Sequence, residues 1–341
     1  MAYTTIDDPS AYFQTTTYTG DGNDDRQVTN SGNSDLQPDW IWVKNRSDAF
    51  NHILQDTSRG LTTGGYLASN QTQAESGATT VLIKTATSNG FTVGTSGAVN
   101  ANTDNLVAWQ WKANAGSTSS NTDGSITSTV QANTTAGFSI ITYTGNETQG
   151  ATIGHGLGKI PEMIIIKCRS QTDAWGVYHS SVGATKYLKL DENSATTSTG
   201  TTVFPTTPTS SLFYLGDSGL VNGNGRTYVA YCFAEIKGYS KLGSYTGNGS
   251  TDGTFVYTGF RPAWLIIKRT DSTGNWFMFD NKREGYNPDN DRLIADDSLT
   301  EADPGESDLL SNGFKMRFTS GNVNASGGTY IYMAFAEHPF V

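Results

Sequence analysis

The carboxylates with the clearest pattern are Glu235 and Glu337, because each follows a Phe-Ala pair at the end of an apolar run. A pair of carboxylates that flanks a glycosidic bond is the usual apparatus for hydrolysing a sugar chain. A catalytic pair, however, converges on one site, whereas these two residues hold the same place in two similar segments. A third such segment has Ala113 there. The pattern indicates a structural role, and the sequence predicts that the protein is not an enzyme.

A second set of polar residues shares one position. Asp56, His179 and Asp280 each lie eighteen residues after a proline, and Arg59 and Arg283 follow the two aspartates three residues later. The simplest interpretation is a local ion pair or a turn cap, because Asp side chains readily bond to nearby backbone N–H groups. We therefore expect no catalytic residue in this set.

No cofactor or metal site is indicated. The four histidines show no ligand spacing: His52, His155, His179 and His338. Phosphate-binding loops and nucleophile elbows are absent from the sequence. Asp21, Asn23 and Asp25 alternate like the start of a calcium loop, but the later glycine and glutamate are missing. For these residues, and for the equally weak run at 289–291, we expect ordinary Asx turns.

Composition limits the partners. The formal net charge of -10 disfavours binding to a phosphate backbone. No stretch approaches the ~20 apolar residues of a membrane span, and the N-terminus lacks the basic flank and apolar core of a secretion signal. We expect no nucleic acid, no membrane insertion, and folding in a cytoplasm. Cys168 and Cys232 are expected to be small buried thiols, since a disulfide would require their strands to be neighbours.

Aromatic residues are the remaining resource, with 7 Trp, 16 Tyr and 15 Phe. Flat rings beside Asn and Asp side chains would suit a surface that stacks against sugars. The tryptophans on apolar runs are instead expected in the core: Trp40, Trp42, Trp109 and Trp111. Because successive residues of a strand point to opposite faces, some rings must face outward or an interface.

The strands that position these residues belong to a sequence pattern that occurs three times along the chain. Each copy has a proline, about five apolar residues and a lysine, which is typical of a buried strand that opens at the proline. We expect the lysine to end the strand with its ammonium in water. Two aromatic positions follow, the first 52 or 53 residues after the proline and the second 20 or 21 residues later. The residues of this repeat signature are Pro38, Lys44, Phe91 and Trp111; Pro161, Lys167, Phe213 and Phe233; and Pro262, Lys268, Phe314 and Phe335.

The spacing predicts an all-β chain of three tandem antiparallel β-sandwich or jelly-roll-like repeat domains of about 100 residues each. They span 18–113, 136–236 and 237–341, and units of this length can own a core, so we expect beads in series. Residues 114–135, mostly Ser, Thr, Asn and Gly, are expected to form a flexible or surface-draped linker. Residues 1–17 are an N-terminal arm that either docks on another subunit or packs as a strand on its own domain. Helix is expected only as short turns, at Gln71 to Ser76 and Ser298 to Ala302.

Several blocks carry a family resemblance: Asp56 to Gly60, the Ser-Asn-Gly-Phe turns that end at Phe91 and Phe314, the endings Thr227 to Glu235 and Thr329 to Glu337, and Tyr245 to Gly249 before Arg261 to Trp264. Together they resemble a repeat domain of virion proteins of tailed phages, notably marine phages and cyanophages. The resemblance covers nearly the whole chain. The second copy departs from it, since Ser180 to Gly183 lacks the arginine. It implies a phage particle component, of the tail fibre or appendage type, and brings no catalytic residues.

We therefore expect a non-enzymatic virion protein that is made in the host cytoplasm and lies on the particle surface. The leading hypothesis is a tail fibre or spike subunit that binds a host surface glycan or protein. It is expected to form a homo-oligomer, a trimer, and to contact other virion proteins. The alternative is a head decoration or tail accessory protein with a purely structural role. A polysaccharide depolymerase is least favoured, because no carboxylate pair presents itself.

Overall fold

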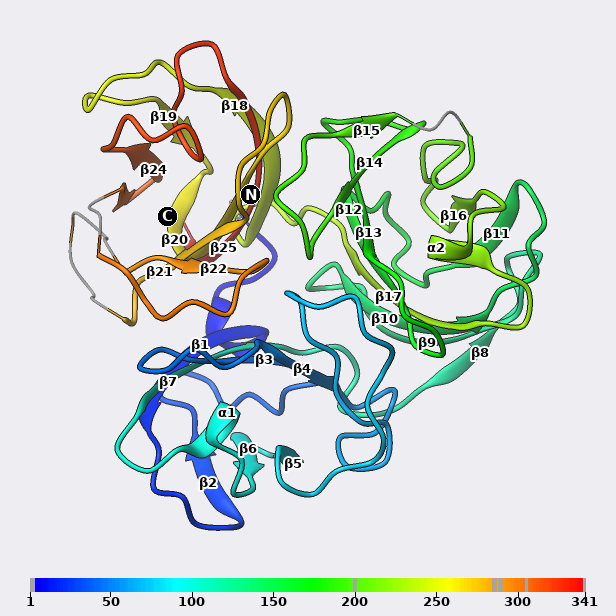
Figure 1. Cartoon of the computed structure of the whole chain (residues 1–341), viewed down its shortest axis with the longest axis horizontal. Helices are drawn as coiled ribbons and strands as arrows, with labels where there is room; N and C mark the ends of the chain where they lie inside the picture. The colour runs from blue at the N-terminus through cyan, green and yellow to red at the C-terminus, as the bar shows by residue number, and fades with distance from the viewer. Residues whose placement is uncertain (1–3, 199–200, 284–286, 288–290, 304–305, 340–341) are drawn as a thin grey trace.

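The computed structural model describes residues 4–198, 201–283, 287, 291–303 and 306–339. Figure 1 shows three lobes of strands grouped around a common centre. We call residues 4–112 the first lobe, 113–236 the second lobe and 237–339 the third lobe. Within the described part of the chain, no helix is long and apolar enough to cross a membrane.

Each lobe has one larger antiparallel sheet. In the first lobe its strands lie in the order β1 (Phe13–Thr19), β7 (Asn105–Trp111), β3 (Trp40–Asn45) and β4 (Ile53–Asp56). In the second lobe the order is β8 (Ser119–Asn121), β9 (Ser128–Asn133), β10 (Phe138–Thr144), β17 (Thr227–Phe233), β12 (Met163–Cys168), β13 (Trp175–His179), β14 (Lys186–Lys189) and β15 (Thr197–Ser198). In the third lobe it is β18 (Ser240–Thr246), β25 (Thr329–Pro339), β20 (Phe260–Arg269), β21 (Phe277–Asp280) and β22 (Leu293–Ile294). Four strands thus follow the same order in every lobe: β1-β7-β3-β4, β10-β17-β12-β13 and β18-β25-β20-β21.

A smaller sheet packs against the larger one in each lobe. Its strands are β2 (Arg26–Thr29), β6 (Gly90–Val93) and β5 (Ile83–Thr87) in the first lobe, β11 (Ala151–Gly154) and β16 (Leu212–Leu215) in the second, and β19 (Phe255–Tyr257), β24 (Gly313–Met316) and β23 (Ser307–Leu310) in the third. The only helical turns in the described residues are η1 (Pro9–Ala11), α1 (Gly97–Asn100) and α2 (Gly219–Asn222). The all-β, β-sandwich-like expectation is confirmed.

The two helical turns proposed from the sequence were misplaced, because residues 71–76 and 298–302 are not helical. The turns that do form begin after a serine cap. Ser96 and Ser218 accept the backbone N–H of the second residue of α1 and of α2, which satisfies a donor that a short helix cannot pair internally.

Each lobe has a hydrophobic core between its two sheets, and the first signature aromatics lie in these cores with no exposed surface: Phe91, Phe213 and Phe314. A Tyr-Thr-Gly sequence occurs once in each lobe, at residues 18–20, 143–145 and 245–247, and its tyrosine closes the core of that lobe. The tyrosine hydroxyls donate to a backbone carbonyl at 2.6 to 2.8 Å, Tyr18 to Val99, Tyr143 to Val221 and Tyr245 to Val323. The following glycine is required by space, since a Cβ on Gly20 would lie 1.8 Å from the Ala101 carbonyl oxygen.

A further hydrophobic cluster lies between the three lobes. The last signature aromatics, Trp111, Phe233 and Phe335, contact one another in pairs, with ring centroids 5.8 to 6.5 Å apart. Across the first and second lobes, Trp40 stacks on Tyr231 at 4.3 Å. The expectation of beads in series was therefore wrong. Each lobe alone would expose large aromatic rings, and their mutual burial stabilises one shared core.

The N-terminal segment belongs to its own chain. β1 pairs with β7 from Phe13 opposite Trp111, and the Phe13 ring stacks on Phe335 of the third lobe at 5.1 Å. Of the two alternatives for residues 1–17, packing on the chain's own sheet is the one observed, although residues 1–3 lie outside the described part.

The polar segment 114–135 is not a linker without structure. It contains β8 and β9, and β9 pairs along β10 from Asn133 opposite Phe138. A ladder needs backbone groups rather than apolar side chains, and threonine suits a pleated surface, so its composition misled the prediction. Segment 114–135 therefore extends the sheet of the second lobe.

The signature prolines do not all open strands. β3 and β12 begin two residues after Pro38 and Pro161, whereas Pro262 lies inside β20 between two register shifts. A residue without an N–H cannot complete a regular ladder, and an irregularity accommodates it.

Candidate functional site

The three signature lysines are buried, with 0% exposure, so the expectation of ammonium groups in water was wrong. Each Nζ instead donates to backbone carbonyls. The acceptors are Asn45 and Asp48 for Lys44; Thr72, Cys168 and Asp173 for Lys167; and Asn193, Ser194, Arg269 and Gly274 for Lys268. Burial lowers the pKa of Lys44 and of Lys268 to about 8. Lys167 and Lys268 thus hold a loop of the preceding lobe.

The polar set Asp56, His179 and Asp280 forms bonds between lobes. Asp56 Oδ2 accepts the Tyr231 hydroxyl at 2.7 Å, so the first lobe is tied to the second. The His179 ring Nε2 lies 3.3 Å from the Tyr332 carbonyl oxygen, which ties the second lobe to the third. Asp280 Oδ2 accepts Trp109 Nε1–H at 2.9 Å and closes the ring to the first lobe.

The local role expected for the two aspartates is also present. Asp56 Oδ1 accepts the Arg59 backbone N–H at 2.9 Å, and Asp280 Oδ1 accepts that of Arg283 at 3.1 Å. Each Oδ2 pairs with the Nε of the same arginine, at 2.5 and 2.6 Å. The sequence therefore indicated the turn cap but not the bond to the neighbouring lobe.

The position four residues earlier carries a ring N–H in every lobe, and the bonds run in the opposite direction. Trp175 Nε1 donates to the Ala68 carbonyl at 3.0 Å, and Trp276 Nε1 donates to the Lys189 carbonyl at 2.8 Å. His52 Nε2 lies 2.9 Å from the Ile294 carbonyl oxygen. Only histidine and tryptophan could supply this ring N–H, and that shared property was the signal that sequence reasoning missed.

Two of the three seams also carry an ion triad in which one arginine is fully buried and the other two side chains are partly exposed. Glu75 pairs with Arg59 of its own lobe and with Arg169 of the second lobe, the latter at 2.9 Å. Glu301 pairs with Arg283 of its own lobe at 2.9 Å and with Arg46 of the first lobe at 2.5 Å. In the second lobe Thr196 takes the corresponding place, since its N–H donates to the Thr270 carbonyl as that of Glu75 donates to Arg169.

The remaining candidates from the sequence form local contacts. Glu235 pairs with Lys241 at 2.8 Å, and Glu337 pairs with Arg261 at 3.2 Å. Asp21 accepts the Asn23 N–H at 2.9 Å, as in the Asx turn that was expected. Of the run 289–291, residues 289 and 290 lie outside the described part.

Neither a disulfide nor a metal cluster is found at the candidate positions. Both cysteines are free and buried, as expected. β12 and β17 are neighbours, but Ile164 rather than Cys168 lies opposite Cys232. Among the described residues no group of three His, Cys, Asp or Glu side chains could hold a metal ion.

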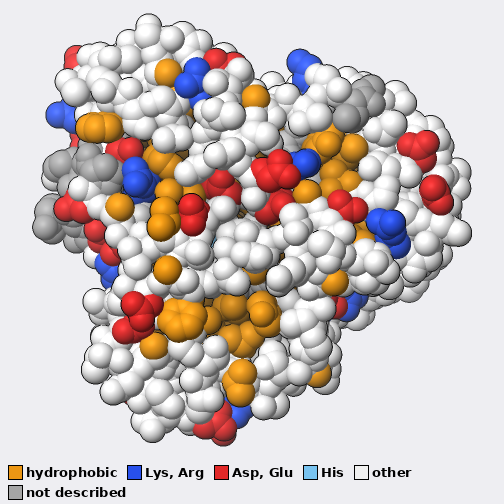
Figure 2. Space-filling model, in the orientation of Figure 1, with side chains coloured by type: hydrophobic (Ala, Val, Ile, Leu, Met, Phe, Trp, Pro, Cys, Tyr) orange, Lys and Arg blue, Asp and Glu red, His pale blue; other side chains and the backbone are white. Residues whose placement is uncertain are grey.

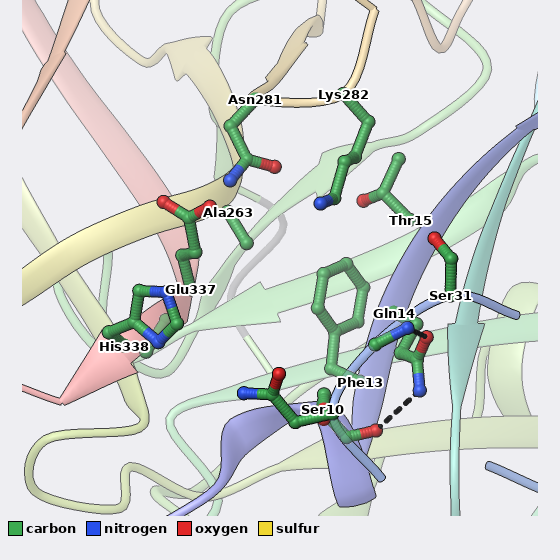
Figure 3. Close-up of a pocket in the computed structure, with 13 residues that line it drawn as sticks. Ser10, Phe13, Gln14, Thr15, Ser31, Ala263, Asn281, Lys282, Glu337 and His338 are labelled. Carbon is green, nitrogen blue, oxygen red and sulfur yellow. Dashed lines mark hydrogen bonds between the residues drawn. The ribbon is translucent and has the colours of Figure 1, made fainter. Parts of the chain in front are cut away.

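A cavity of about 160 Å³ lies at the seam between the first and third lobes (Figure 3). The residues that line it are Ser10, Phe13, Gln14, Thr15, Ser31, Gly32 and Asn33 of the first lobe, and Ala263, Asn281, Lys282, Ala336, Glu337 and His338 of the third. Figure 3 shows Lys282 and Thr15 pointing toward one another from opposite lobes, with the Phe13 ring between the two walls. We call this space the seam cavity.

Three buried polar atoms on residues that line the seam cavity have no hydrogen-bond partner. They are Thr15 Oγ1 and Asn281 Oδ1, on residues only 5% and 8% exposed, and Glu337 Oε2, which forms an ion pair with Arg261 at 3.2 Å. Lys282 and His338 are exposed beside them. Buried polar groups are nearly always paired, so these atoms mark a place where a small polar molecule can bind. No sequence signal could have found the pair of Thr15 and Asn281, because its members lie 266 positions apart and on different lobes.

Fold and site together define an all-β protein of packed antiparallel sheets, in which buried polar residues join three lobes and the seam cavity lies between the first and the third. The family described as Domain of unknown function (DUF7483) matches residues 8–339, and the chain belongs to that family. The match covers all three lobes and their junctions. In comparisons with curated proteins and with solved structures, nothing matches the chain.

Proposed function

We propose that the protein is a non-enzymatic virion component of a tailed phage, a tail fibre or spike subunit that binds a glycan on the host surface. The seam cavity carries the proposal. A sugar presents hydroxyl groups that both donate and accept, as Thr15 Oγ1 and Asn281 Oδ1 require, and an apolar ring face that suits Phe13. The resemblance of the sequence to phage virion repeat domains supports the setting.

The proposal assigns no catalytic activity, and the contacts of the candidate polar residues support this. Asp56, His179 and Asp280 are buried at seams and fully engaged in holding lobes together. Glu235 and Glu337 are held in local ion pairs. Release of reducing sugar from host polysaccharide by the purified protein would revive the depolymerase hypothesis.

We propose further that the three lobes are three copies of one domain and that the protein assembles as a homotrimer with other virion proteins. The common strand order and the repeated bonds between lobes support the first part. β8 is the outermost strand of the largest sheet and supports the second, because the free donors and acceptors of an edge strand can pair with another copy. Light scattering of the purified protein tests it, and a monomer mass at all concentrations would contradict it.

The alternative, a head decoration or tail accessory protein, is favoured by one observation. The lobes surround a centre where Trp111, Phe233 and Phe335 meet, so one chain presents three similar faces around an approximate threefold axis. Such a chain can sit on a threefold position of a particle and repeat one contact three times. Figure 2 shows acidic and basic side chains on the face in view, with hydrophobic side chains gathered in patches, the plainest of them over the lower lobe.

The experiment that separates the two is a pull-down. The tagged, purified chain is mixed with intact cyanobacterial cells that such phages infect and, separately, with empty phage heads. Saturable binding to cells is the result expected for a host-binding subunit. Binding to heads without binding to cells would replace it with the decoration hypothesis.

A further inference from the structure

The seam between the first and second lobes shows what belongs in the seam cavity. The Thr57 backbone N–H donates to the Asp39 carbonyl at 2.8 Å, and the Asn281 N–H donates to the Ala263 carbonyl at 3.0 Å. Thr57 therefore corresponds to Asn281, and Asp39 to Ala263. The two seams can be compared residue by residue on this basis.

At the first–second seam a carboxamide fills the space. Gln131 of β9 is fully buried. With its nitrogen directed at the carboxylate, it donates to Asp39 Oδ1 at 2.9 Å, and its oxygen accepts from Thr57 Oγ1 at 3.0 Å. The carboxyl of Asp39 also accepts backbone N–H groups from Ala113 and Gly116, both at 2.7 Å. Thr57, which corresponds to Asn281 of the seam cavity, is thus bonded to a buried amide.

At the third–first seam, within the described part of the chain, no side chain bonds to Asn281 Oδ1 as Gln131 bonds to Thr57. β1 is the edge strand of its sheet, so no strand runs beside it as β9 runs beside β10. Alanine replaces the carboxylate at position 263, which leaves room. Thr15 stands opposite Trp109 as Ile140 stands opposite Tyr231, so a hydroxyl replaces an apolar side chain at the cavity wall.

We propose that the seam cavity binds the acetamido group of an N-acetylated sugar. This inference rests on the proposed glycan-binding function and names the class of glycan. The acetamido N–H donates to Asn281 Oδ1, and its carbonyl accepts from the Thr15 hydroxyl, so that an amide again occupies the place beside β1 that the Gln131 amide occupies beside β10. Its methyl group contacts apolar surface supplied by Phe13, Ala263 and Ala336. The sugar ring lies toward the mouth, where Lys282 and His338 are exposed.

The first test is a titration of the purified full chain with methyl N-acetyl-β-glucosaminide and, in parallel, with methyl β-glucoside, followed by NMR. The acetamido sugar is expected to bind at least about tenfold more tightly, because the glucoside leaves buried polar atoms unpaired. Equal affinity for the two sugars, or no binding of either, would overturn the inference.

Variants then locate the binding. Thr15→Ile gives one cavity wall the residue type of Ile140, its counterpart in the second lobe. Asn281→Thr gives the other wall the residue type of Thr57, its counterpart in the first lobe. Each is expected to lose about tenfold or more in affinity for the acetamido sugar. Thr29→Ile makes the first of these changes at an exposed position of β2 and is expected to bind like the unchanged chain. If Asn281→Thr keeps its melting temperature and also keeps full affinity, the site lies elsewhere.

A competition experiment keeps the two proposals distinct. If the chain binds cells and the acetamido sugar does not displace it, the inference fails while host binding stands. If the chain binds no cells but binds the acetamido sugar through Thr15 and Asn281, host binding fails while the inference stands.

Discussion

Lys268 keeps a charge inside the molecule by surrounding it with four backbone carbonyls, at 2.7 to 3.2 Å from Nζ. Two of these carbonyls belong to the second lobe, at Asn193 and Ser194, so the lysine joins elements that the sequence separates by about 75 positions. Carbonyl oxygens replace water around the ammonium, but burial still favours the neutral form. The side chain therefore contributes to the seam and to the pH dependence of stability.

The first prediction concerns alkaline pH. The folded-state pKa of Lys268 is about 8, against 10.5 in the unfolded chain. Between these values the unfolded chain holds a proton that the folded chain has lost, so the contribution of Lys268 to stability should rise with pH from about 8 to about 10. Replacement Lys268→Met should lower the slope of unfolding free energy against pH by up to about 1.4 kcal/mol per pH unit. Urea unfolding across this range measures it, and the exposed Lys186→Met is the control.

The second prediction concerns acid pH. Burial lowers the pKa of His179 to about 4 from 6.5, so between these values only the unfolded chain is protonated. Stability should therefore fall as pH falls through this range, by up to about 1.4 kcal/mol per pH unit for this residue. His179→Gln keeps a donor for the Tyr332 carbonyl and should show a shallower fall. Thermal unfolding of both proteins at a series of pH values measures the effect. Identical pH profiles for the two proteins would show that His179 does not titrate on unfolding.

The loops that follow β4 and β22 act as the elements that lock two of the seams. Glu75 and Glu301 each sit between an arginine of their own lobe and one of the neighbouring lobe. A backbone hydrogen bond accompanies the ion pairs of Glu301, since its N–H donates to the Arg46 carbonyl at 3.1 Å. Removing the glutamate charge from such a group leaves a fully buried arginine, Arg59 or Arg283, with less compensating charge.

The third prediction follows for Glu75→Gln. Loss of the carboxylate leaves Arg59, whose side chain is fully buried, with Asp56 as its remaining ionic partner. The free energy of unfolding should fall by about 3 kcal/mol, measured in urea. Glu192→Gln removes a carboxylate that is 40% exposed and pairs with Lys189, so it should cost less than about 1 kcal/mol. Equal losses for the two variants would mean that the triad does not stabilise the seam.

At the scale of the whole molecule, the shared aromatic cluster makes the three lobes dependent on one another. Trp111 contacts Trp264 of the third lobe at a centroid distance of 5.4 Å, and Trp109 donates to Asp280 of the same lobe. Bonds between lobes run in both directions around the centre. Separation of any one lobe would therefore expose aromatic rings and leave buried polar groups of the other two lobes without hydrogen-bond partners.

The fourth prediction is that the full chain unfolds in one cooperative transition, because the lobes share a core. In calorimetry the van't Hoff and calorimetric enthalpies should agree. A fragment of residues 1–236 should bind a hydrophobic dye and aggregate, because it exposes Trp109, Trp111 and Phe233. A soluble, monomeric fragment with a cooperative transition of its own would show that the lobes are independent domains.

The sequence by itself determined the class of fold and the burial of the large apolar side chains on its strands. Alternating and apolar runs, opened by prolines and separated by glycine and asparagine turns, specify antiparallel strands through local sterics and the need to bury apolar surface. Trp40 and Trp111 could be placed in a core on these grounds. The residues that cap turns, such as Asp56 beside Arg59, could also be predicted, because their partners lie three positions away.

Only the tertiary structure decided which core those rings enter and what the polar residues bind. A pattern of spacing cannot distinguish lobes strung along a chain from lobes packed around Trp111, Phe233 and Phe335, since the local elements are the same in both. The carbonyls around Lys268, and the meeting of Thr15 with Asn281 across the seam cavity, join residues far apart in the sequence. Such contacts arise only when the lobes pack together, because hydrogen bonds are short-ranged and their partners come from different lobes.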